Sequence, residues 1–549
     1  MKIILKPLFF YLFVFFPLLS HSQVPDLILT NGRVFTSDTT QLYVEAIAIK
    51  DGIITATGTS ATIEKLAKSQ TKRLDLKGML VVPGFNDAHN HLLINDLGAY
   101  QIAFTTMNPS WEIMKDSLLK TIKRLPEGQW ITAIIGPDIA NSPEINRFAI
   151  DKIVNKHPVR FLSWWGHVGL FNTLGMHLFD ISETEADPKG GFYERLPDGR
   201  TLTGRAFEKN AYNPHSKYTK IAAMRNEENL INELKGITQE MLKMGITSYQ
   251  NMCTMATAGD LTKLWKKAGL PFRLRLIRWA DMDADGSMDI PGKELPKKRS
   301  DVPLLTVMGT KWLLEGTPIE QGAEHFDAYP NRADWHGRMN YSEAEIKRMC
   351  REAIQRKDQI CFHIGGDKST GKLLDIMESM NIDWKPLRPR FEHGDEIDYS
   401  TAYLEKAKRM GIIIVQNPTH FSPTEGVDIP LHLPTHGMAL KSLLKAKIPL
   451  AIGSDGPFNP FLNIMLATIH PSRPSEAITR EEAVIAYTYT SAFAEFEEQN
   501  KGTLTVGKVA DLAILSQDIF RIPPPALMQT TSVLTMVNGK IVYDAGVIK

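Results

Sequence analysis

The chain has 549 residues, more than a single hydrophobic core usually covers, so at least two structural units are expected. Hydrophobic residues make up 43% of the chain and charged residues 23%, which are the proportions of an ordinary globular protein. The formal charge of +1 excludes the strongly basic field that nucleic-acid binding requires, so we expect a small molecule as the partner and no nucleic acid.

Residues 1–22 have the pattern of a signal peptide. Lys2 and Lys6 precede the apolar run Leu8–Leu19, and a Ser-His-Ser segment then offers the small residues that a signal peptidase reads. The run is shorter than the roughly 20 residues that cross a bilayer, and no cysteine follows it to accept a lipid. We therefore predict export to the periplasm or out of the cell, without a stable membrane anchor after cleavage; an uncleaved anchor is the alternative.

The two ends of the chain carry similar β patterns. Residues 26–57 alternate apolar and polar positions and are broken by Asn-Gly and Asp-Gly, dipeptides suited to tight hairpin turns. Residues 509–516 and 533–546 repeat the order of strand, Asn-Gly and strand. We expect residues 24–80 and 500–549 to pair into one small β-sandwich domain.

Between these ends, short apolar runs alternate with helix-like segments. The runs are residues 130–136, 159–166, 245–252, 272–279, 307–316, 359–366, 389–395, 411–418 and 449–457. Ser342 and Glu345 have the spacing of a capping box at the start of one helix. Repeated strand and helix units indicate an α/β fold, a parallel sheet closed into a (β/α)8 TIM-type barrel, which we place at residues 81–499. The stretch 100–235 exceeds one strand and helix pair, so an insertion is expected to cover the mouth there.

The stretch VVPGFNDAHNH, residues 81–91, carries two histidines two positions apart. On a strand, positions i and i+2 point to the same face, so His89 and His91 can bind one metal ion together. A helical metal site would use positions i and i+4 instead. Two polar loop histidines are the alternative for this motif by itself.

Further metal-type residues follow later strands. Lys311, His363, His393 and Asp455 each lie in or just after an apolar run, at the strand end that hosts chemistry in a barrel. Imidazole and carboxylate ligands suit Zn²⁺ or a similar ion, with an open position for water. A single histidine near a strand end is more often structural, but a series of such side chains at successive strand ends is hard to explain in that way.

With these motifs, the chain resembles the amidohydrolase superfamily, in the amidohydrolase family 3 branch that includes N-substituted formamide deformylases and, more distantly, D-aminoacylases. The segments that carry the resemblance are VVPGFNDAHNH, GTKWLLEG, FHIGGD, FEHGD and IGSDGPFNP, with KGTLTVGKVADLAILSQD near the C-terminus. The resemblance covers nearly the whole chain after the first 22 residues and implies a metal-dependent hydrolase.

The resemblance also implies roles for individual residues. The implied metal ligands are His89, His91, Lys311, His363, His393 and Asp455. The two later histidines would hold a second ion if one is present, and Lys311 would bridge the ions after carboxylation by CO2; an uncarboxylated Lys311 would be an ion-pair partner. Asp455 would be catalytic, because it can take a proton from water whose pKa a bound metal lowers from 15.7 to roughly 7.

Other residues of the matching segments are expected to contact substrate or to support the ligands. The predicted substrate-binding residues are His167, Asn172, Gln416 and His420, and the predicted supporting residues are Asp87 and Glu392. Glu315 departs from the aspartate that is usual in the family. Arg273, Arg275 and Arg278 alternate along one predicted strand and could bind a carboxylate, face solvent or be ion-paired.

The leading hypothesis is an exported hydrolase that cleaves a C–N bond in an amide, formamide or cyclic amide with a metal-activated hydroxide. Zn²⁺ is the expected ion, with one or two per chain. The alternatives are a deaminase or an ester or carbamate hydrolase at the same site, and an inactive binding protein on this scaffold. The three cysteines are expected to be buried thiols with at most one disulfide, and a homo-oligomer is left open.

Overall fold

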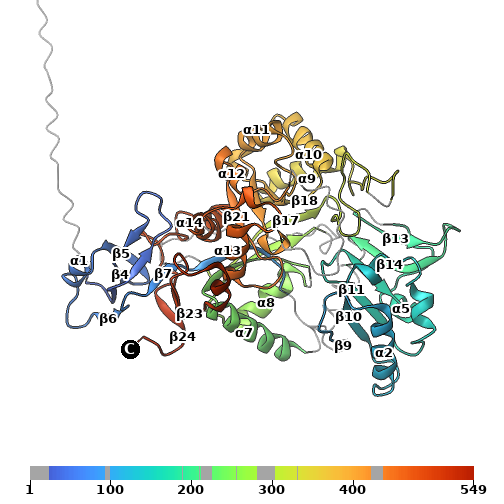
Figure 1. Cartoon of the computed structure of the whole chain (residues 1–549), viewed down its shortest axis with the longest axis horizontal. Coiled ribbons are helices and arrows are strands. Elements are labelled where there is room, and N and C mark those ends of the chain that lie inside the picture. The colour runs from blue at the N-terminus through green and yellow to red at the C-terminus, as the bar shows by residue number, and fades with distance from the viewer. Residues whose placement is uncertain are drawn as a thin grey trace, which may run out of the picture.

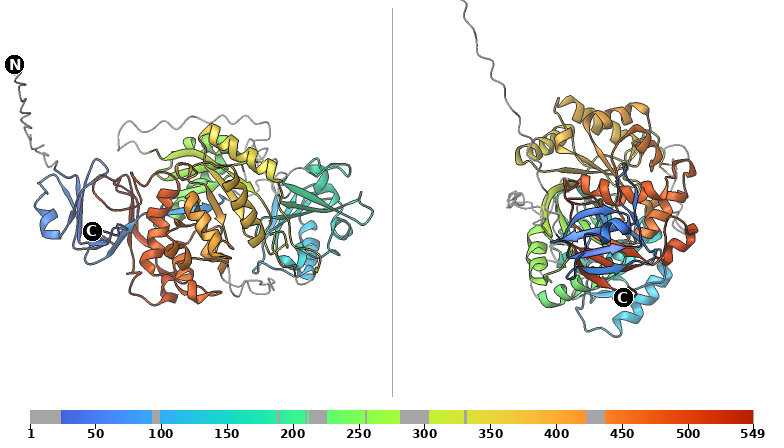
Figure 2. Two further views of the ribbon diagram at one scale, coloured as in Figure 1. Left: turned by 90° about the horizontal axis from the view of Figure 1, so that it is seen from above. Right: turned by 90° about the vertical axis from the view of Figure 1, so that its left-hand side faces the viewer.

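The computed structural model describes residues 24–92, 99–187, 190–208, 211, 226–254, 256–280, 303–329, 332–421 and 437–548, and the predicted signal peptide lies outside them. A parallel barrel occupies the centre of the molecule (Figure 1). Sheets built from the chain ends lie at one end of it and an inserted lobe lies at the other, as the left view of Figure 2 also shows.

Within the described residues, eight parallel strands form the barrel sheet in the order of the chain. They are β8 (Phe85–Asn90), β15 (Ile246–Met252), β16 (Arg273–Trp279), β17 (Leu305–Leu313), β18 (Ile360–Ile364), β19 (Arg390–His393), β20 (Ile413–Gln416) and β21 (Leu450–Ile452). The backbone N–H of Asp455, just after β21, donates to the carbonyl oxygen of His89 in β8 at 2.9 Å, which links the last strand to the first. The predicted (β/α)8 barrel is confirmed.

The segments between the strands form the helices expected from the sequence. They are α7 (Glu227–Lys243), α8 (Ala258–Ala268), α9 (Glu343–Arg356), α10 (Asp367–Ser379), α11 (Thr401–Met410), α12 (Lys441–Ala446), α13 (Pro460–Ile469), α14 (Arg480–Ile485) and α15 (Ser491–Ala494), with short helical turns η2 (Lys385–Leu387), η3 (Pro418–Phe421), η4 (Pro474–Glu476) and η5 (Ala486–Thr490). Helix α9 begins at the predicted capping box of Ser342 and Glu345 and buries Ile346, Met349 and Cys350 on one face.

Both ends of the chain contribute strands to one sheet. Its order is β24 (Lys540–Asp544), β23 (Ser532–Val537), β22 (Leu512–Leu515), β7 (Leu80–Pro83), β2 (Arg33–Phe35) and β3 (Tyr43–Val44). A second sheet consists of β5 (Ile53–Gly58), β4 (Ala46–Lys50), β1 (Leu27–Thr30) and β6 (Lys72–Asp75); helix α1 (Ser60–Glu64) and turn η6 (Pro524–Gln529) complete this region. Leu29 and Ile47 of the second sheet share a hydrophobic cluster with Ile514 and Leu534 of the first, so the two sheets pack face to face.

Gly84 separates the end sheet from the barrel. Strand β7 belongs to the sheet of the chain ends and β8 is the first strand of the barrel, with this single residue between them. A Cβ atom at Gly84 would overlap the side chain of Thr247 in the neighbouring strand β15. The close approach explains why glycine stands at this point of the sequence.

The insertion forms a lobe with a sheet and a core of its own. The sheet order is β13 (Gly191–Arg195), β14 (Leu202–Glu208), β12 (Val168–Phe171), β11 (Val159–Ser163), β10 (Ile131–Ile135) and β9 (Tyr100–Ile102), and the helices are α2 (Trp111–Ile122), α3 (Pro137–Ala140), α4 (Arg147–Asp151) and α5 (Thr173–Leu178). The apolar runs at residues 130–136 and 159–166 therefore form lobe strands and not barrel strands.

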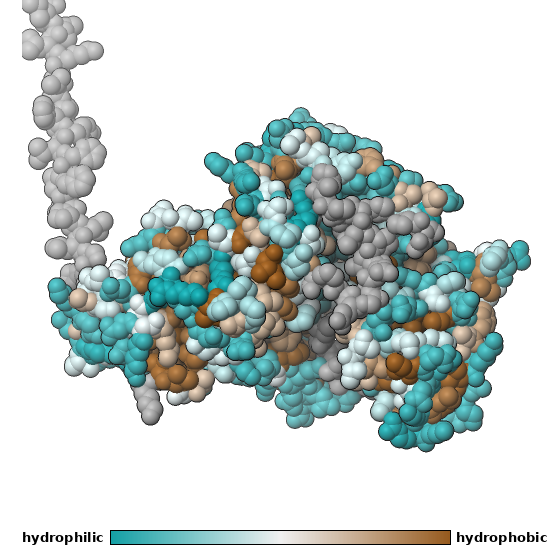
Figure 3. All heavy atoms as spheres, viewed as in Figure 1, coloured by the Kyte–Doolittle hydropathy of each residue, from teal (hydrophilic) through white to brown (hydrophobic). Residues whose placement is uncertain are grey.

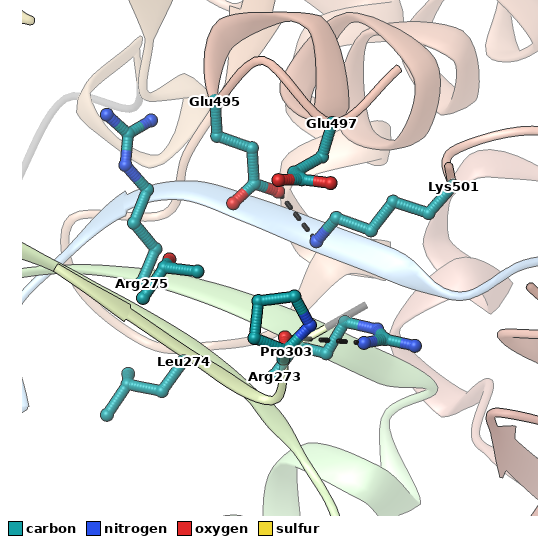
Figure 4. A pocket seen from close by; sticks show the side chains of 8 residues that line it. Arg273, Leu274, Arg275, Pro303, Glu495, Glu497 and Lys501 are labelled. Atoms are coloured by element: carbon teal, nitrogen blue, oxygen red, sulfur yellow. Dashed lines mark hydrogen bonds and ion pairs between the residues drawn. The ribbon is translucent and has the colours of Figure 1, made fainter. Parts of the chain in front are cut away.

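The alternating arginines of β16 are ion-paired or hydrogen-bonded inside the protein. Arg273 donates to Asp511 at 3.1 Å, Arg275 to Gln359 at 2.6 Å and Arg278 to Asp358 at 3.0 Å. Figure 4 shows Arg273 and Arg275 beside the ion pair of Glu495 and Lys501, around a cavity of about 10 Å³, which has room for one water molecule. These arginines thus connect parts of the scaffold.

The surface and the thiols have ordinary properties. Figure 3 shows hydrophilic residues over most of the visible described face, with hydrophobic residues in small, separate groups. Among the described residues, no helix combines the length and the apolar character that crossing a membrane requires. Cys253, Cys350 and Cys361 are buried free thiols, as predicted.

Candidate active site

The predicted strand-end residues come together at the carboxyl ends of the barrel strands. His89 lies on β8, Lys311 on β17, His363 on β18 and His393 on β19, and Asp455 follows β21. The backbone φ angles of His393 and Asp455 are +69° and +39°, a left-handed conformation that costs of the order of 1–3 kcal/mol in a residue other than glycine. Strain of this kind is typical of residues whose position matters for function.

Two imidazole nitrogens face the carboxylate of Asp455. Nε2 of His91 lies 3.4 Å from Oδ1 of Asp455, and Nε2 of His89 lies 3.7 Å from Oδ2. Nδ1 of His89 contacts Glu392 at 2.6 Å and Nδ1 of His91 contacts the carbonyl oxygen of Met252 at 3.1 Å. Because both Nδ1 atoms face hydrogen-bond acceptors, each Nε2 atom is left with its lone pair toward Asp455.

The protonation states suit metal binding. Burial lowers the pKa of His91 to about 4, and burial together with the charge of Lys311 lowers the pKa of His89. Burial raises the pKa of Asp455, but His89 and His91 outweigh it and hold that pKa well below its usual range. Neutral imidazoles and an ionised carboxylate converge on one point, and this donor set fits a divalent ion.

Glu392 supports His89 from the interior of the barrel. Its two oxygens accept hydrogen bonds from Arg390 at 2.7 and 3.0 Å, and both side chains are fully buried. Burial raises the pKa of Glu392, but the charge of Arg390 and the hydrogen bond with His89 hold it far below its usual range. The carboxylate therefore stays ionised and orients the His89 ring.

Lys311 lies beside the same ring. Its Nζ is 3.4 Å from Nε2 of His89, the residue is 2% exposed, and burial lowers its pKa. No carboxylate within the described part of the chain forms an ion pair with Nζ. Burial is the larger effect on the pKa of Lys311 and the charges of Glu392 and Asp455 oppose it, so the bridging role and the ion-pair role of Lys311 both stay predictions.

A second group of ligand atoms extends toward the mouth. Nε2 of His393 and Nε2 of His420 each lie 3.8 Å from Oδ2 of Asp455, and the three residues can hold a metal ion together. The rings of His363 and His393 have centroids 4.6 Å apart. The ring of His363 thus lies next to that of His393, further from Asp455. His420, which was predicted to bind substrate, lies as close to Asp455 as His393 does.

Asp87 and Gln416 hold the ends of the strands in place. Asp87 accepts hydrogen bonds from the backbone N–H of Ser454 at 3.0 Å and the hydroxyl of Tyr487 at 3.1 Å, and burial raises its pKa to about 6. Gln416 donates from Nε2 to the carbonyl oxygen of His393 at 2.6 Å. Asp87 thus joins β8 to the segment that follows β21, and the amide nitrogen of Gln416 orients the ligand strand.

The structure does not bring Asn172 to this site. Its Oδ1 accepts from the backbone N–H groups of Val159 and Gly175, both at 2.8 Å, and its Nδ2 donates to the carbonyl oxygens of Val154 and His157. The side chain caps helix α5 inside the lobe and is fully buried. Its predicted contact with substrate is corrected to a structural role, because both ends of the amide are already bonded.

Other carboxylates near the site were not among the predicted site residues. Glu315 accepts hydrogen bonds from the backbone N–H groups of Gly365 and Gly366 at 2.7 and 2.9 Å, so it orders the turn after His363. Glu208 contacts His167 at 2.8 Å. The sequence gives no spacing signal for Glu208, because a long-range pairing of lobe strands brings it to the histidine.

A closed parallel barrel with imidazoles and one carboxylate converging at its carboxyl ends defines a metal-binding (β/α)8 barrel of the hydrolase type. The sequence profile of the amidohydrolase family matches residues 72–543; the chain belongs to this family and is a hydrolase of carbon–nitrogen bonds.

Comparisons with known proteins agree with this assignment. Protein LONG AFTER FAR-RED 3 of Arabidopsis thaliana is 26% identical over 528 residues, covering 90% of this chain and 87% of its own length. The N-substituted formamide deformylase of Arthrobacter pascens is 26% identical over 559 residues, covering 95% and 99%. The crystal structure of an uncharacterized metal-dependent hydrolase from Pyrococcus horikoshii OT3 has the same fold, with a TM-score of 0.67 at 19% identity over 91% of this chain and 99% of that one.

Proposed function

We propose that the protein is an exported, metal-dependent hydrolase of small-molecule amides, with N-substituted formamides as the first substrate class to test. The observation that carries the metal-dependent reaction is the position of Asp455 between Nε2 of His89 and Nε2 of His91. Similarity to an N-substituted formamide deformylase over almost the whole of both chains supports the substrate class. Residues 1–22 support the export.

His89, His91 and Asp455 would hold the ion. A divalent ion supplies Lewis acidity there, polarising a carbonyl oxygen and lowering the pKa of water. The carboxylate of Asp455 accepts the proton of the attacking water and returns it to the leaving nitrogen, so that an amine and a carboxylic acid are formed. Glu392 keeps the His89 ring in place throughout, because its hydrogen bond to Nδ1 does not involve the reacting atoms.

We further propose Zn²⁺ as the ion, with His363 and His393 available for a second one. Imidazole and carboxylate ligands favour zinc among the common divalent ions. The lowered pKa of the buried Lys311 amine makes it a suitable group for carboxylation by CO2, and the carbamate oxygens would then serve as ligands. These assignments make one or two ions per chain the expected stoichiometry.

The proposal is tested on purified protein by elemental analysis and by assays of formate release. N-alkyl and N-aryl formamides are offered beside the matching acetamides, before chelation, after chelation and after return of Zn²⁺. We expect formate and amine in equal amounts, loss of activity on chelation and recovery with zinc. Ammonia released from an aminated heterocycle, with no amide hydrolysed, would overturn the proposal in favour of deamination.

A further inference from the structure

A cluster of three buried side chains lies where the lobe meets the barrel. His167 lies between β11 and β12, Glu208 is the last residue of β14, and Glu320 lies in the segment that follows β17. His167 and Glu208 are 5% and 3% exposed, and the side chain of Glu320 is 2% exposed. The cluster therefore joins two lobe residues to one residue of the barrel.

Glu208 fixes the ring of His167 in two ways. Its Oε2 lies 2.8 Å from Nδ1 of His167, and its backbone N–H donates to the carbonyl oxygen of His167 at 2.9 Å. The ring so held has its centroid 4.9 Å from that of His363, the outer histidine of the site. Backbone and side chain of Glu208 together thus fix the lobe imidazole that lies against a barrel imidazole.

Glu320 holds the same point from the barrel. Its Oε1 lies 3.9 Å from Nδ1 of His167, and its Oε2 accepts a hydrogen bond from Nε1 of Trp165 at 2.8 Å. A Cβ atom on Gly316 would overlap the carboxylates of both Glu208 and Glu320, so the two acids converge over this glycine. Trp165 is two residues from His167, and the bond therefore ties the lobe turn to the barrel segment.

The arrangement repeats one found deeper in the site. There, Glu392 contacts Nδ1 of His89 at 2.6 Å and leaves the other nitrogen toward Asp455. A carboxylate behind a histidine orients the ring and selects its tautomer, and behind a metal-ligating histidine the loss of such a partner typically lowers metal affinity or activity by about 10–100-fold. If the pair of Glu208 and His167 had only a structural role, nothing would require the His167 ring to lie against His363.

We propose that Glu208 and Glu320 are positioning residues that hold His167 against His363, so that the lobe supplies one of the side chains on which the activity of the site depends. The inference rests on the proposed function and deepens it. Two further contacts join the lobe to the same barrel segment: Arg338 lies 4.2 Å from the ring of Phe192, and Asn141 donates to Ile319 at 3.0 Å. These contacts hold the lobe, and His167 with it, against one segment of the barrel.

The first test compares variants that separate position from charge. Glu208→Asp keeps the charge but withdraws the carboxylate from Nδ1, whereas Glu208→Gln keeps the length and an oxygen that accepts the same hydrogen bond. We expect kcat/KM for a formamide substrate to fall about 10–100-fold in the Asp variant and less in the Gln variant, with unchanged melting temperature and metal content. Glu194, which pairs with Arg205 on the neighbouring lobe strand, provides the matched Asp and Gln controls.

The second test needs no substrate, so it also applies if the proposed function fails. Carbethoxylation of His167 by diethyl pyrocarbonate is followed by peptide mass mapping, with His157 of the same lobe, also 5% exposed, as internal reference. We expect Glu208→Asp and Glu320→Ala to speed the reaction of His167 and not that of His157. Equal rates in wild type and variants, or a Glu208→Asp enzyme as active as Glu194→Asp, would overturn the inference.

Discussion

The carboxylate of Asp455 lies within 3.8 Å of imidazole nitrogens of four histidines. His89 and His393 are buried, His91 is partly buried, and all three have lowered pKa values, so the carboxylate faces neutral rings and their lone pairs. An anion in such surroundings is stabilised by a cation that the rings can ligate. At the scale of single residues, Asp455 therefore joins metal binding to proton transfer.

Replacement of Asp455 by asparagine should impair metal binding and proton transfer but leave the fold unchanged. The amide has nearly the same shape but cannot accept the proton of water, and general-base catalysis typically contributes 10²–10⁴-fold. We expect kcat for formate release to fall by about that factor, with bound metal reduced and circular dichroism unchanged. Wild-type kcat in the Asn variant would exclude Asp455 as the base.

Glu392→Gln tests the support behind His89. The change leaves Arg390 buried without its anion and weakens the hydrogen bond to Nδ1, so both stability and metal affinity should fall. We expect a loss of about 3–5 kcal/mol in the free energy of unfolding and about 10–100-fold weaker metal binding, measured against a chromophoric chelator. Glu498, paired with Arg388 at 2.8 Å outside the site, is the control, and Glu498→Gln should leave metal affinity unchanged.

At the scale of the elements, the junction of β7 and β8 determines how the end sheet joins the barrel. Gly84 is the single residue between these strands, and the side chain of Thr247 in β15 fills the space where a Cβ atom would stand. The first ligand strand is thus placed by contact with its barrel neighbour as well as by its hydrogen bonds. A larger residue at this position has to displace β8 or β15.

Gly84→Ala should consequently destabilise the fold by about 1–3 kcal/mol in urea unfolding, as overpacking of a core does. The double variant Gly84→Ala/Thr247→Gly should recover part of the overpacking loss, although it opens space elsewhere. Gly236→Ala is the opposite control, since Gly236 lies in helix α7 with open space around it, and alanine there should stabilise by up to about 1 kcal/mol. A Gly84→Ala protein as stable as wild type would show that β8 can shift freely.

The elements also show what the sequence could and could not predict. The barrel and the residues at its strand ends followed from local patterns, because each apolar run and the polar residue after it are neighbours in the chain. The partners of His167 did not, because Glu208 and Glu320 reach it only through the pairing of lobe strands and the docking of the lobe. The motif around Asn172 predicted a contact with substrate, whereas its amide oxygen accepts a hydrogen bond as the N-cap of α5.

At the scale of the whole molecule, a buried carboxyl group makes stability fall as pH rises. Glu396 is 4% exposed; burial, and then Asp367 and Asp395, raise its pKa to about 9. In the unfolded chain the same group loses its proton near 4.5. The folded state therefore binds more protons between these values, and the contribution of Glu396 to stability is present at low pH and lost as pH rises toward 9.

Glu396→Gln should remove this dependence, because the amide imitates the protonated acid at every pH. We expect the free energy of unfolding of the variant, relative to wild type, to increase steadily from pH 5 to pH 9 in urea titrations. Glu405→Gln on the surface of α11 shows the effect of losing an exposed charge. A Glu396→Gln difference that stays constant over this range would contradict the raised pKa.

The sheet of the chain ends places β7 between β2, near the N-terminus, and β22, more than 400 residues later. During synthesis β7 lacks one neighbour until the last tenth of the chain has emerged from the ribosome. Pairings this distant in sequence form slowly, since a long loop must close first. The end sheet, which leads through Gly84 into the first barrel strand, is therefore expected to be completed last, after every barrel strand has been synthesised.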